Sequence, residues 1–592
     1  MGSIVTSIIS DWKDRFTPFM GWIGELKNGS TLKADAIAGI TVALVLVPQS
    51  MAYAQLAGLP AYVGLYASFL PVIIASLFGS SRQLATGPVA IVSLMTAASL
   101  EPLATGGIIS GVGGYVAYAA ILALMVGSFQ LMLGLFKLGI LVDFLSHPVV
   151  VGFTNAAAII IATSQLNKVF GVTVEKAEHH YETIWRVIEA IPETHLATFA
   201  MGLFSIFILV YLKQRLPKAP NVLVAVVVTT LLSYFIGFEE MGGAVIGNIQ
   251  SGLPGFSIPF FHTDVSSNNI MGLIVPALII SILGFVEAIS VAKAISSQTR
   301  QRLSSNQELV GQGLGNLTAG FFQGYAVSGS FSRSAVNFAA NARTGFSSVI
   351  TGVLVATTLL FLTPLLYHLP QATLATVIMV AVANLIKFKP IIHAWKVQPH
   401  DGIIAIFVFV ATLVTAPHLE TGIMIGVVMS LGLYLYRTMS PRFAEVARHE
   451  DGTLREADLF ELKTSDTVGV YRYDGDLYFA NTGYLEGKLL NSIAEKPNMK
   501  VLILDLEAVA QVDATGEEML SNLADRLMTA GIEFYVARAK KQILDAFERS
   551  GLYHKIGEER FTRERTQAAK LAKKKLGDAI DIEPLLSVQH TS

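Results

Sequence analysis

The segment "AVSGSFSRSAVN", residues 326–337, places a cation between two stretches that have the composition of membrane spans. This cation, Arg333, has no carboxylate near it in the sequence. A charge near the centre of a bilayer costs at least about 2.5–3.5 kcal/mol on insertion scales. A chain that carries an arginine there needs a physical reason for it, and the segments on either side supply one.

The composition is that of a polytopic membrane protein. Of the 592 residues, 52% are hydrophobic and only 15% are charged, whereas average usage is about 25% charged. Residues 36–81 contain no Lys, Arg, Asp or Glu, which is enough chain for two spans of ~20 residues. From Arg442 onward the charges crowd together, as in a soluble domain. The chain has no cysteine, which excludes disulfides and thiolate metal sites.

Apolar periodicity marks fourteen candidate membrane segments. They are residues 36–57, 62–80, 87–100, 115–136, 148–168, 196–213, 222–238, 270–295, 307–325, 330–342, 346–367, 371–386, 402–417 and 421–437. Two of them, 87–100 and 330–342, are too short to cross ~30 Å of hydrocarbon as helices. Each is the third member of a group of seven, and each follows a stretch with Gly and Ser or Thr, "LATGPVAIVSLM" and "AVSGSFSRSAVN".

Short, interrupted segments at corresponding positions of two halves indicate an inverted-repeat transporter and its binding site. Two half-helices would begin near the midplane with their N-termini facing each other. Each N-terminus presents unpaired N–H groups and a charge of about +0.5. Together with Arg333 they predict a strongly electropositive site that binds an anion. The alternative is that Arg333 extends toward the interface or pairs with a distant carboxylate such as Glu287.

Lysine and arginine in short loops predict the orientation. These residues precede the first span, recur in a later loop and follow the last span: Lys13, Arg15, Lys27, Lys33, Lys387, Lys389, Lys396, Arg437 and Arg442. With an even number of spans, both termini are expected in the cytoplasm, and the protein in the cell (inner) membrane. The predicted parts are a cytoplasmic segment 1–33, a transmembrane domain 34–440, a cytoplasmic domain 441–575 and a tail 576–592.

The soluble part alternates strand and helix patterns, which predicts a small α/β domain. "VGVYRYDGDLYFA" is interpreted as two strands around an Asp-Gly turn, and "KVLILDLEAV" as a buried strand. "ATGEEMLSNLADRLMTAG" and "KQILDAFERSGL" are predicted helices on either side of the strand "EFYVARA". The tail segment "RERTQAAKLAKKKLGDAI" is a basic amphipathic helix, for which a solvated face is favoured over a lipid-binding one.

Long motifs resemble the SulP family of anion transporters over nearly the whole chain. The first resembles the sulfate permease signature, "AGITVALVLVPQSMAYAQLAGLPAYVGLYASFLPVIIASLFGSSRQLATGPVA"; the match continues through "SHPVVVGFTNAAAIIIATSQL", "SNQELVGQGLGNLTAGFFQGYAVSGSFSRSAVN" and a terminal STAS-like domain. The resemblance implies a polytopic α-helical fold of fourteen transmembrane segments in a seven-plus-seven inverted repeat. It also implies a core domain moving against a gate domain, and a homodimer with cytoplasmic STAS domains.

The resemblance also implies which residues bind the anion. It assigns them to a broken first span and to the starts of both short helices: Gln49, Tyr53, Val89, Ala90, Ser332 and Arg333. Amide, hydroxyl and guanidinium donors suit this role, and Pro48 would support the break by removing a backbone donor. Tyr53 as a packing aromatic and Gln49 as an interhelical contact remain alternatives.

Glu287, in "ILGFVEAISVAK", is the predicted proton-coupling residue. A carboxylate buried without a cation is readily protonated, and Lys293, six residues on, is not on the same helix face. Sodium-coupled family members carry an aspartate here and a hydroxyl residue one turn later, where this chain has Val291. A permanent pair between Glu287 and Arg333 is the alternative.

The expected function is proton-coupled uptake of an inorganic oxyanion, first sulfate, by elevator-like alternating access. The alternatives are a sodium-coupled bicarbonate or dicarboxylate symporter and, from another class, a membrane signalling module built on STAS. A nucleobase permease would carry a carboxylate in place of Arg333. We expect a transporter rather than an enzyme, without cofactor, metal or nucleic-acid partner.

Two further motifs receive structural interpretations. Glu308 lies three residues after Ser305, the spacing of a helix capping box. "VDATG", residues 512–516, resembles the phosphoacceptor loop of anti-sigma-factor antagonists, but Thr515 is predicted to cap the next helix rather than to be phosphorylated.

Overall fold

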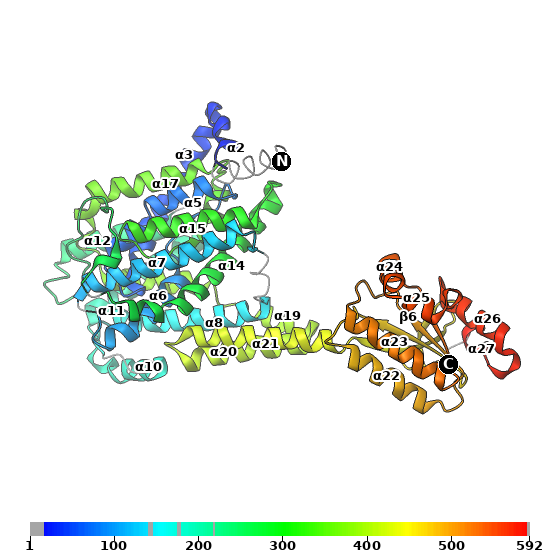
Figure 1. The fold of residues 1–592 in the computed structure, drawn as a ribbon. Helices are drawn as coiled ribbons and strands as arrows, with labels where there is room; N and C mark the ends of the chain where they lie inside the picture. The colour runs from blue at the N-terminus through cyan, green and yellow to red at the C-terminus, as the bar shows by residue number, and fades with distance from the viewer. Residues whose placement is uncertain are drawn as a thin grey trace. The chain divides into compact units, whose positions relative to one another are not determined.

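The computed structural model describes most of the chain, which divides between Ser430 and Leu431 into two compact units (Figure 1). The described residues are 17–109, 111–139, 146–174, 179–216, 220–263 and 265–588. Residues 1–16 of the predicted N-terminal segment, with Lys13 and Arg15, therefore lie outside the described residues, as do residues 589–592 of the tail. Each unit is described by itself.

Helices cover all fourteen predicted apolar segments. In chain order they are α3 (Gly29–Leu56), α4 (Ala61–Ala67) with α5 (Leu70–Phe78), α6 (Ala90–Thr105), α7 (Gly111–Leu135), α8 (His147–Ser164), α11 (Leu196–Arg215), α12 (Asn221–Ile236), α14 (Ile274–Thr299), α15 (Ser305–Phe321), α16 (Phe331–Ala339), α17 (Phe346–Thr357), α18 (Gln371–Ala383), α20 (Pro399–Thr415) and α21 (Leu419–Met439). Among the described residues, eight helical stretches are long and apolar enough to cross a membrane.

The two short helices are the third members of their groups, as an inverted repeat predicts. α16 has nine residues and is only ~14 Å long at 1.5 Å per residue; α6 has sixteen and extends further than predicted. Each follows a two-residue strand, β1 (Thr86–Gly87) and β2 (Ser328–Gly329). These strands pair antiparallel, Thr86 with Gly329 and Gly87 with Ser328. The pairing brings the starts of the two half-helices together.

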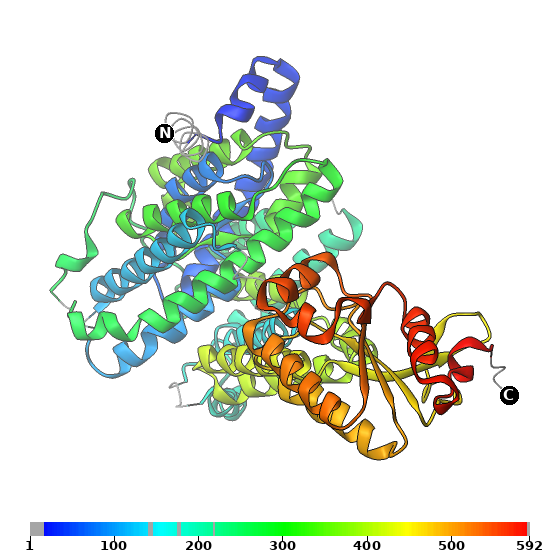
Figure 2. The same ribbon diagram turned by 45° about the vertical axis from the view of Figure 1, so that its right-hand side comes forward.

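Close helix packing surrounds this strand pair. α15 and α7 run side by side in Figures 1 and 2, and glycines at the contact let their backbones touch. A Cβ atom added to Gly313 would lie 2.6 Å from the backbone nitrogen of Leu131, and one added to Gly127 would lie 2.6 Å from that of Leu317. Any larger residue at either position would force the two helices apart.

Two amphipathic helices lie outside the predicted segments. They are α10 (His180–Glu189) and α19 (Lys389–Val397), and each exposes a tryptophan, Trp185 at 63% and Trp395 at 47%. Amphipathic helices with exposed aromatic side chains are typical of the membrane–water interface. Neither helix forms a long apolar segment in the sequence, because only one face of each is apolar.

The second unit is a six-stranded sheet flanked by helices. Its strand order is β4 (Leu454–Glu456), β3 (Arg442–Arg448), β5 (Val468–Asp474), β6 (Val501–Asp505), β7 (Glu533–Ala537) and β8 (Phe561–Thr562). β5 to β8 are parallel, and β3 is antiparallel to both of its neighbours. The helices are α22 (Thr482–Glu495), α23 (Ala514–Thr529), α24 (Lys541–Ser550), α25 (Leu552–Ile556), α26 (Arg565–Leu576) and α27 (Glu583–Leu586).

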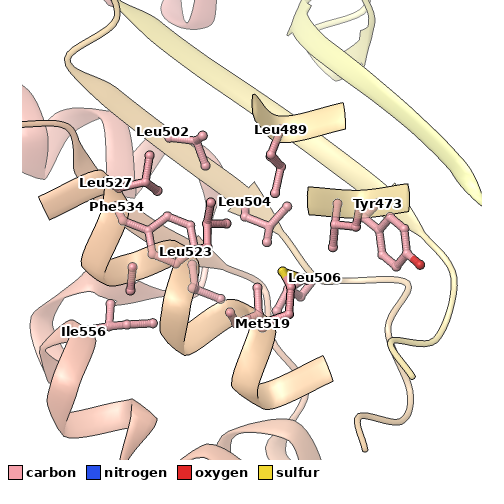
Figure 3. Close-up of a cluster of buried hydrophobic side chains, with 14 of the residues drawn as sticks. Tyr473, Leu489, Leu502, Leu504, Leu506, Met519, Leu523, Leu527, Phe534 and Ile556 are labelled. Carbon is pink, nitrogen blue, oxygen red and sulfur yellow. The ribbon is translucent and has the colours of Figure 1, made fainter. Parts of the chain in front are cut away.

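Both faces of this sheet are buried. Figure 3 shows one face, where Leu502 and Leu504 of β6 and Phe534 of β7 pack against Leu523 and Leu527 of α23. On the other face, residues of β5, β6 and β7 pack against α26 and the segment that follows it, including Ile580 and Leu585. The core of the unit therefore extends beyond residue 575, the predicted end of the cytoplasmic domain.

The predicted hairpin around Asp474 and Gly475 is wrong. Only its first half, β5, forms a strand; Leu477 makes an isolated parallel bridge with Val512 instead of pairing back on β5. The reason is a distant contact, because the Asp476 carboxylate accepts hydrogen bonds from the backbone N–H groups of Ala510 (2.8 Å) and Gln511 (2.9 Å). These bonds hold the chain beside the loop after β6.

The helix cap within "VDATG" is Asp513 rather than Thr515. The Asp513 carboxylate accepts a hydrogen bond from the backbone N–H of Gly516 at 2.8 Å, whereas Thr515 lies within the first turn of α23. Aspartate is as good an N-cap as threonine or better. The cap therefore falls two residues before the predicted one.

Candidate functional site

The site is built where the two half-helices begin. Val89 is the N-cap of α6 and Ala90 its first residue; both are buried, and no described side chain caps the helix there. Ser330 caps α16, and its hydroxyl accepts a hydrogen bond from the backbone N–H of Arg333 at 3.4 Å. First-turn N–H groups have no partner within their own helix. The first turns of α6 and α16 therefore place two sets of N–H donors beside the pair of strands β1 and β2.

Arg333 is the largest fully buried side chain of the protein's described residues, at 0% exposure. Its Nη1 donates to Oε1 of Gln49 at 3.5 Å, a long hydrogen bond. Its Nε and Nη2 are buried and have no hydrogen-bond partner among the described residues. Nη2 lies 3.2 Å from the place where a Cβ on Gly87 would be, so the glycine makes room for the guanidinium. Two charged donors are thus left for a ligand.

α3 contributes Gln49 and Tyr53, both buried and one helical turn apart. The hydrogen bond from Arg333 places Gln49 at the site, and Tyr53 lies one turn further along the same helix. The predicted break in this span is wrong, because α3 runs through Pro48 without interruption. A proline removes only its own N–H from the helix, and the turns on either side keep the helix continuous.

Glu287 lies on α14, the helix that packs against β2. The Ser328 hydroxyl of β2 donates to the carbonyl of Gly284 at 2.6 Å, one turn before Glu287. The Oε2 atom of Glu287 is buried and has no hydrogen-bond partner among the described residues. Arg333 interacts with Glu287 electrostatically, but the described residues contain no ion pair between them. Val291, one turn later, is buried in an apolar cluster.

Ser332 differs from the other predicted site residues because it is exposed. Its hydroxyl lies 3.3 Å from that of Ser330, the buried serine that caps α16. Sequence reasoning also missed a buried contact between the Tyr325 hydroxyl and the Ser93 hydroxyl, at 2.9 Å, which joins the approach to β2 with α6. These two positions are 232 residues apart, so no local pattern could have paired them.

The capping role predicted for Glu308 is also wrong. Ser304 caps α15, and its hydroxyl accepts from the N–H of Gln307 at 3.3 Å. The Glu308 carboxylate instead accepts hydrogen bonds from the N–H groups of Ser80 (2.9 Å) and Ser81 (3.0 Å). Glu308 therefore fixes the loop that leads into β1, because the loop offers it two free donors.

The chemistry of the site is that of an anion receptor. Buried guanidinium donors without partners, next to two helix N-termini, stabilise negative charge. Within the described ranges, no group of three or more His, Cys, Asp or Glu residues could bind a metal ion. Of the six predicted binding residues, Gln49, Tyr53, Val89, Ala90 and Arg333 are buried around the two helix starts.

Comparison with known proteins gives two family matches. Residues 32–408 match the sulfate permease family and residues 460–569 match the STAS domain. The chain is 33% identical to the chloroplastic sulfate transporter 4.1 of Arabidopsis thaliana, over 93% of this chain and 82% of that protein. It is also 33% identical to a probable sulfate transporter of Mycobacterium tuberculosis, over 89% of this chain and 93% of that protein.

Solved structures agree on the fold. The structure of SLC26A9 superposes with a TM-score of 0.87 at 22% identity, covering 96% of this chain and 94% of that one. The transmembrane domain of the cyanobacterial bicarbonate transporter BicA gives a TM-score of 0.56 at 25% identity, covering 68% and 98%. The fold is therefore the predicted one, with fourteen transmembrane segments in a seven-plus-seven inverted repeat and a STAS domain.

Proposed function

The chain belongs to the sulfate permease family, and on that premise we propose that it is a secondary active transporter that takes up sulfate together with a proton. The observation that carries the proposal is Arg333, which is fully buried between two helix starts with Nε and Nη2 unpaired among the described residues. A buried cation that lacks an ion pair is costly. An anion that binds there removes this cost.

Sulfate suits the donors that converge on the site. Its oxygens can accept from the guanidinium fork and from first-turn N–H groups of α6 and α16 at the same time. The relatives named as sulfate transporters support the same choice. The bicarbonate transporter that shares the fold supports bicarbonate as the alternative substrate.

Proton coupling is assigned to Glu287. A proton on its carboxylate, whose Oε2 is buried without a hydrogen-bond partner among the described residues, would remove a charge that burial disfavours. It would also offset part of the charge of an entering dianion. Sodium is disfavoured because the side chain one turn later, Val291, has no oxygen to offer.

Transport would occur by elevator-like alternating access in a homodimer, with both termini on the cytoplasmic side of the cell membrane. The proposal keeps the predicted division at residues 440 and 441, which falls between the end of α21 at Met439 and the start of β3 at Arg442. The STAS domain would then lie in the cytoplasm and adjust transport rather than carry it.

Uptake of labelled sulfate into proteoliposomes tests the function. Proton and sodium gradients are imposed separately, and unlabelled sulfate, bicarbonate, chloride and a dicarboxylate compete with the label. We expect accumulation that follows an inward proton gradient and is displaced best by sulfate. Accumulation driven by sodium and displaced best by bicarbonate would favour the alternative, and no anion uptake under any gradient would refute transport.

A further inference from the structure

One face of α15 carries three buried polar side chains at four-residue spacing, Glu308, Gln312 and Asn316. Residues four apart lie above one another on a helix, so the three form a single polar line inside an apolar environment. Buried polar groups are expensive unless they are hydrogen-bonded. The hydrogen-bond partners of these three side chains therefore indicate their structural role.

Asn316 holds the chain directly before β2. Its Oδ1 accepts from the backbone N–H of Val327 at 2.7 Å, and its Nδ2 donates to the backbone carbonyl of the same residue at 3.0 Å. Both backbone groups of Val327 are thus fixed by one side chain. Ser328 follows immediately, and α16 with Arg333 begins three residues later.

Gln312 holds the other strand. Its Nε2 donates to the Thr86 hydroxyl of β1 at 2.8 Å, and Glu308, one turn earlier, binds the Ser80 and Ser81 N–H groups that precede this strand. One helix face therefore fixes both strands of the pair, and through them the starts of both half-helices.

The same line reaches the helix that carries Glu287. Nδ2 of Asn316 also donates to Oε1 of Gln130 on α7, at 2.9 Å. Gln130 in turn donates from Nε2 to the carbonyl of Ser281 on α14, at 3.1 Å. Asn316 thus connects the start of β2 with two neighbouring helices, although it forms no hydrogen bond with Arg333 among the described residues.

We propose that Asn316 and Gln312 are positioning residues for the anion site: from one face of α15 they set the register of β1 and β2, and so the mutual placement of the two helix starts and Arg333. This inference rests on the proposed anion binding. Neither residue touches the anion. Their effect is on geometry, because donors that are displaced from a ligand lose most of their hydrogen-bond strength.

The chain contains a matched control in Asn155 on α8. This asparagine is buried like Asn316 and also forms two hydrogen bonds with one backbone residue. Its Oδ1 accepts from the N–H of Lys387 at 2.6 Å, and its Nδ2 donates to the carbonyl of Lys387 at 3.2 Å. Its described hydrogen bonds do not involve either strand. Asn316→Leu and Asn155→Leu therefore break the same kind of bidentate contact at two different places.

The experiment compares both variants in the full-length protein. Sulfate affinity is measured by calorimetry, and folding is measured by thermal unfolding. Amide hydrogen exchange is measured in the segments 84–93 and 325–336. We expect both variants to lose thermal stability, but only Asn316→Leu to bind sulfate at least about tenfold more weakly, equivalent to about 1.4 kcal/mol. We also expect only Asn316→Leu to exchange faster in the two segments.

Equal sulfate affinities and equal exchange in the two variants would overturn the proposal. If Asn316→Leu does not fold, Thr86→Val serves instead, because it removes only the hydroxyl that Gln312 binds; unchanged affinity and exchange in that variant would overturn the proposal as well. If the wild type binds no sulfate, the proposed function fails, and the exchange data alone decide whether Asn316 positions the strands.

Discussion

Replacement of Arg333 tests the anion site most directly. In Arg333→Ala the site loses its guanidinium, of which Nε and Nη2 are buried and unpaired among the described residues. A hydrogen bond to a charged group contributes about 1.5–3 kcal/mol. Two such bonds at the lower value amount to about 3 kcal/mol, or roughly 150-fold in Kd. The helix starts at Val89 and Ser330 remain, so weak binding should persist.

The same change should leave the protein folded. Arg333 is at 0% exposure and forms no ion pair among the described residues, so its removal breaks no salt bridge. The cost of the cavity is offset by removal of a buried charge. Arg333→Met, which fills more of the volume without the charge, separates these two effects.

Calorimetry with sulfate, together with thermal unfolding, provides the assay. Arg343→Ala is the matched control, because this exposed arginine follows α16 and donates from Nη1 to the hydroxyls of Ser30 (3.0 Å) and Thr31 (3.3 Å), away from the site. It should bind sulfate like the wild type. Wild-type affinity in a folded Arg333→Ala protein would refute the assignment of the site.

Three other predictions concern coupling and the soluble domain. Glu287→Gln, which mimics the protonated carboxyl, should bind sulfate normally but lose its stimulation by an inward proton gradient; sulfate accumulation that still responds to external acid in proteoliposomes would contradict this role. Truncation after Pro441 should leave a membrane domain that is monodisperse by size-exclusion chromatography in mild detergent but transports slowly; aggregation or full-rate uptake would argue against it. Arg565→Ala strands Asp505, which is at 0% exposure, and should destabilise the STAS domain by about 3–5 kcal/mol in urea unfolding. The exposed pair of Arg526 should contribute only about 0–1 kcal/mol, so equal losses in Arg565→Ala and Arg526→Ala would contradict the reasoning.

Local patterns in the sequence predicted most of the fold. The length of each apolar segment predicts a membrane span, because a spanning helix must cross the hydrocarbon and satisfy its backbone hydrogen bonds within itself. The two short segments indicated the repeat, because each is the third segment of its half, and this position can be counted directly along the sequence. The position of Arg333 between them predicted an electropositive site, because a cation in an apolar segment is costly and generally marks a place where an opposite charge binds.

The predicted hairpin and the predicted capping box were wrong because a side chain in each forms hydrogen bonds with residues distant in the sequence. An Asp-Gly turn ordinarily favours a hairpin, but Asp476 binds the N–H groups of Ala510 and Gln511. The spacing of Glu308 fits a capping box, but Ser80 and Ser81, which lie 228 and 227 residues away, offer it two donors. Hydrogen-bond partners of this kind are set by tertiary contact and leave no local signal.

The sequence by itself determined the fourteen apolar segments and that one of them carries a cation with no carboxylate near it in the chain. Only the tertiary structure decided what surrounds that cation. Gln49 and Arg333 are 284 residues apart and meet where α16 packs against α3. α15 holds both strands by side chains that local periodicity would assign to an ordinary polar face. Periodicity follows from backbone geometry within a few residues, whereas the site depends on which distant surfaces exclude water together.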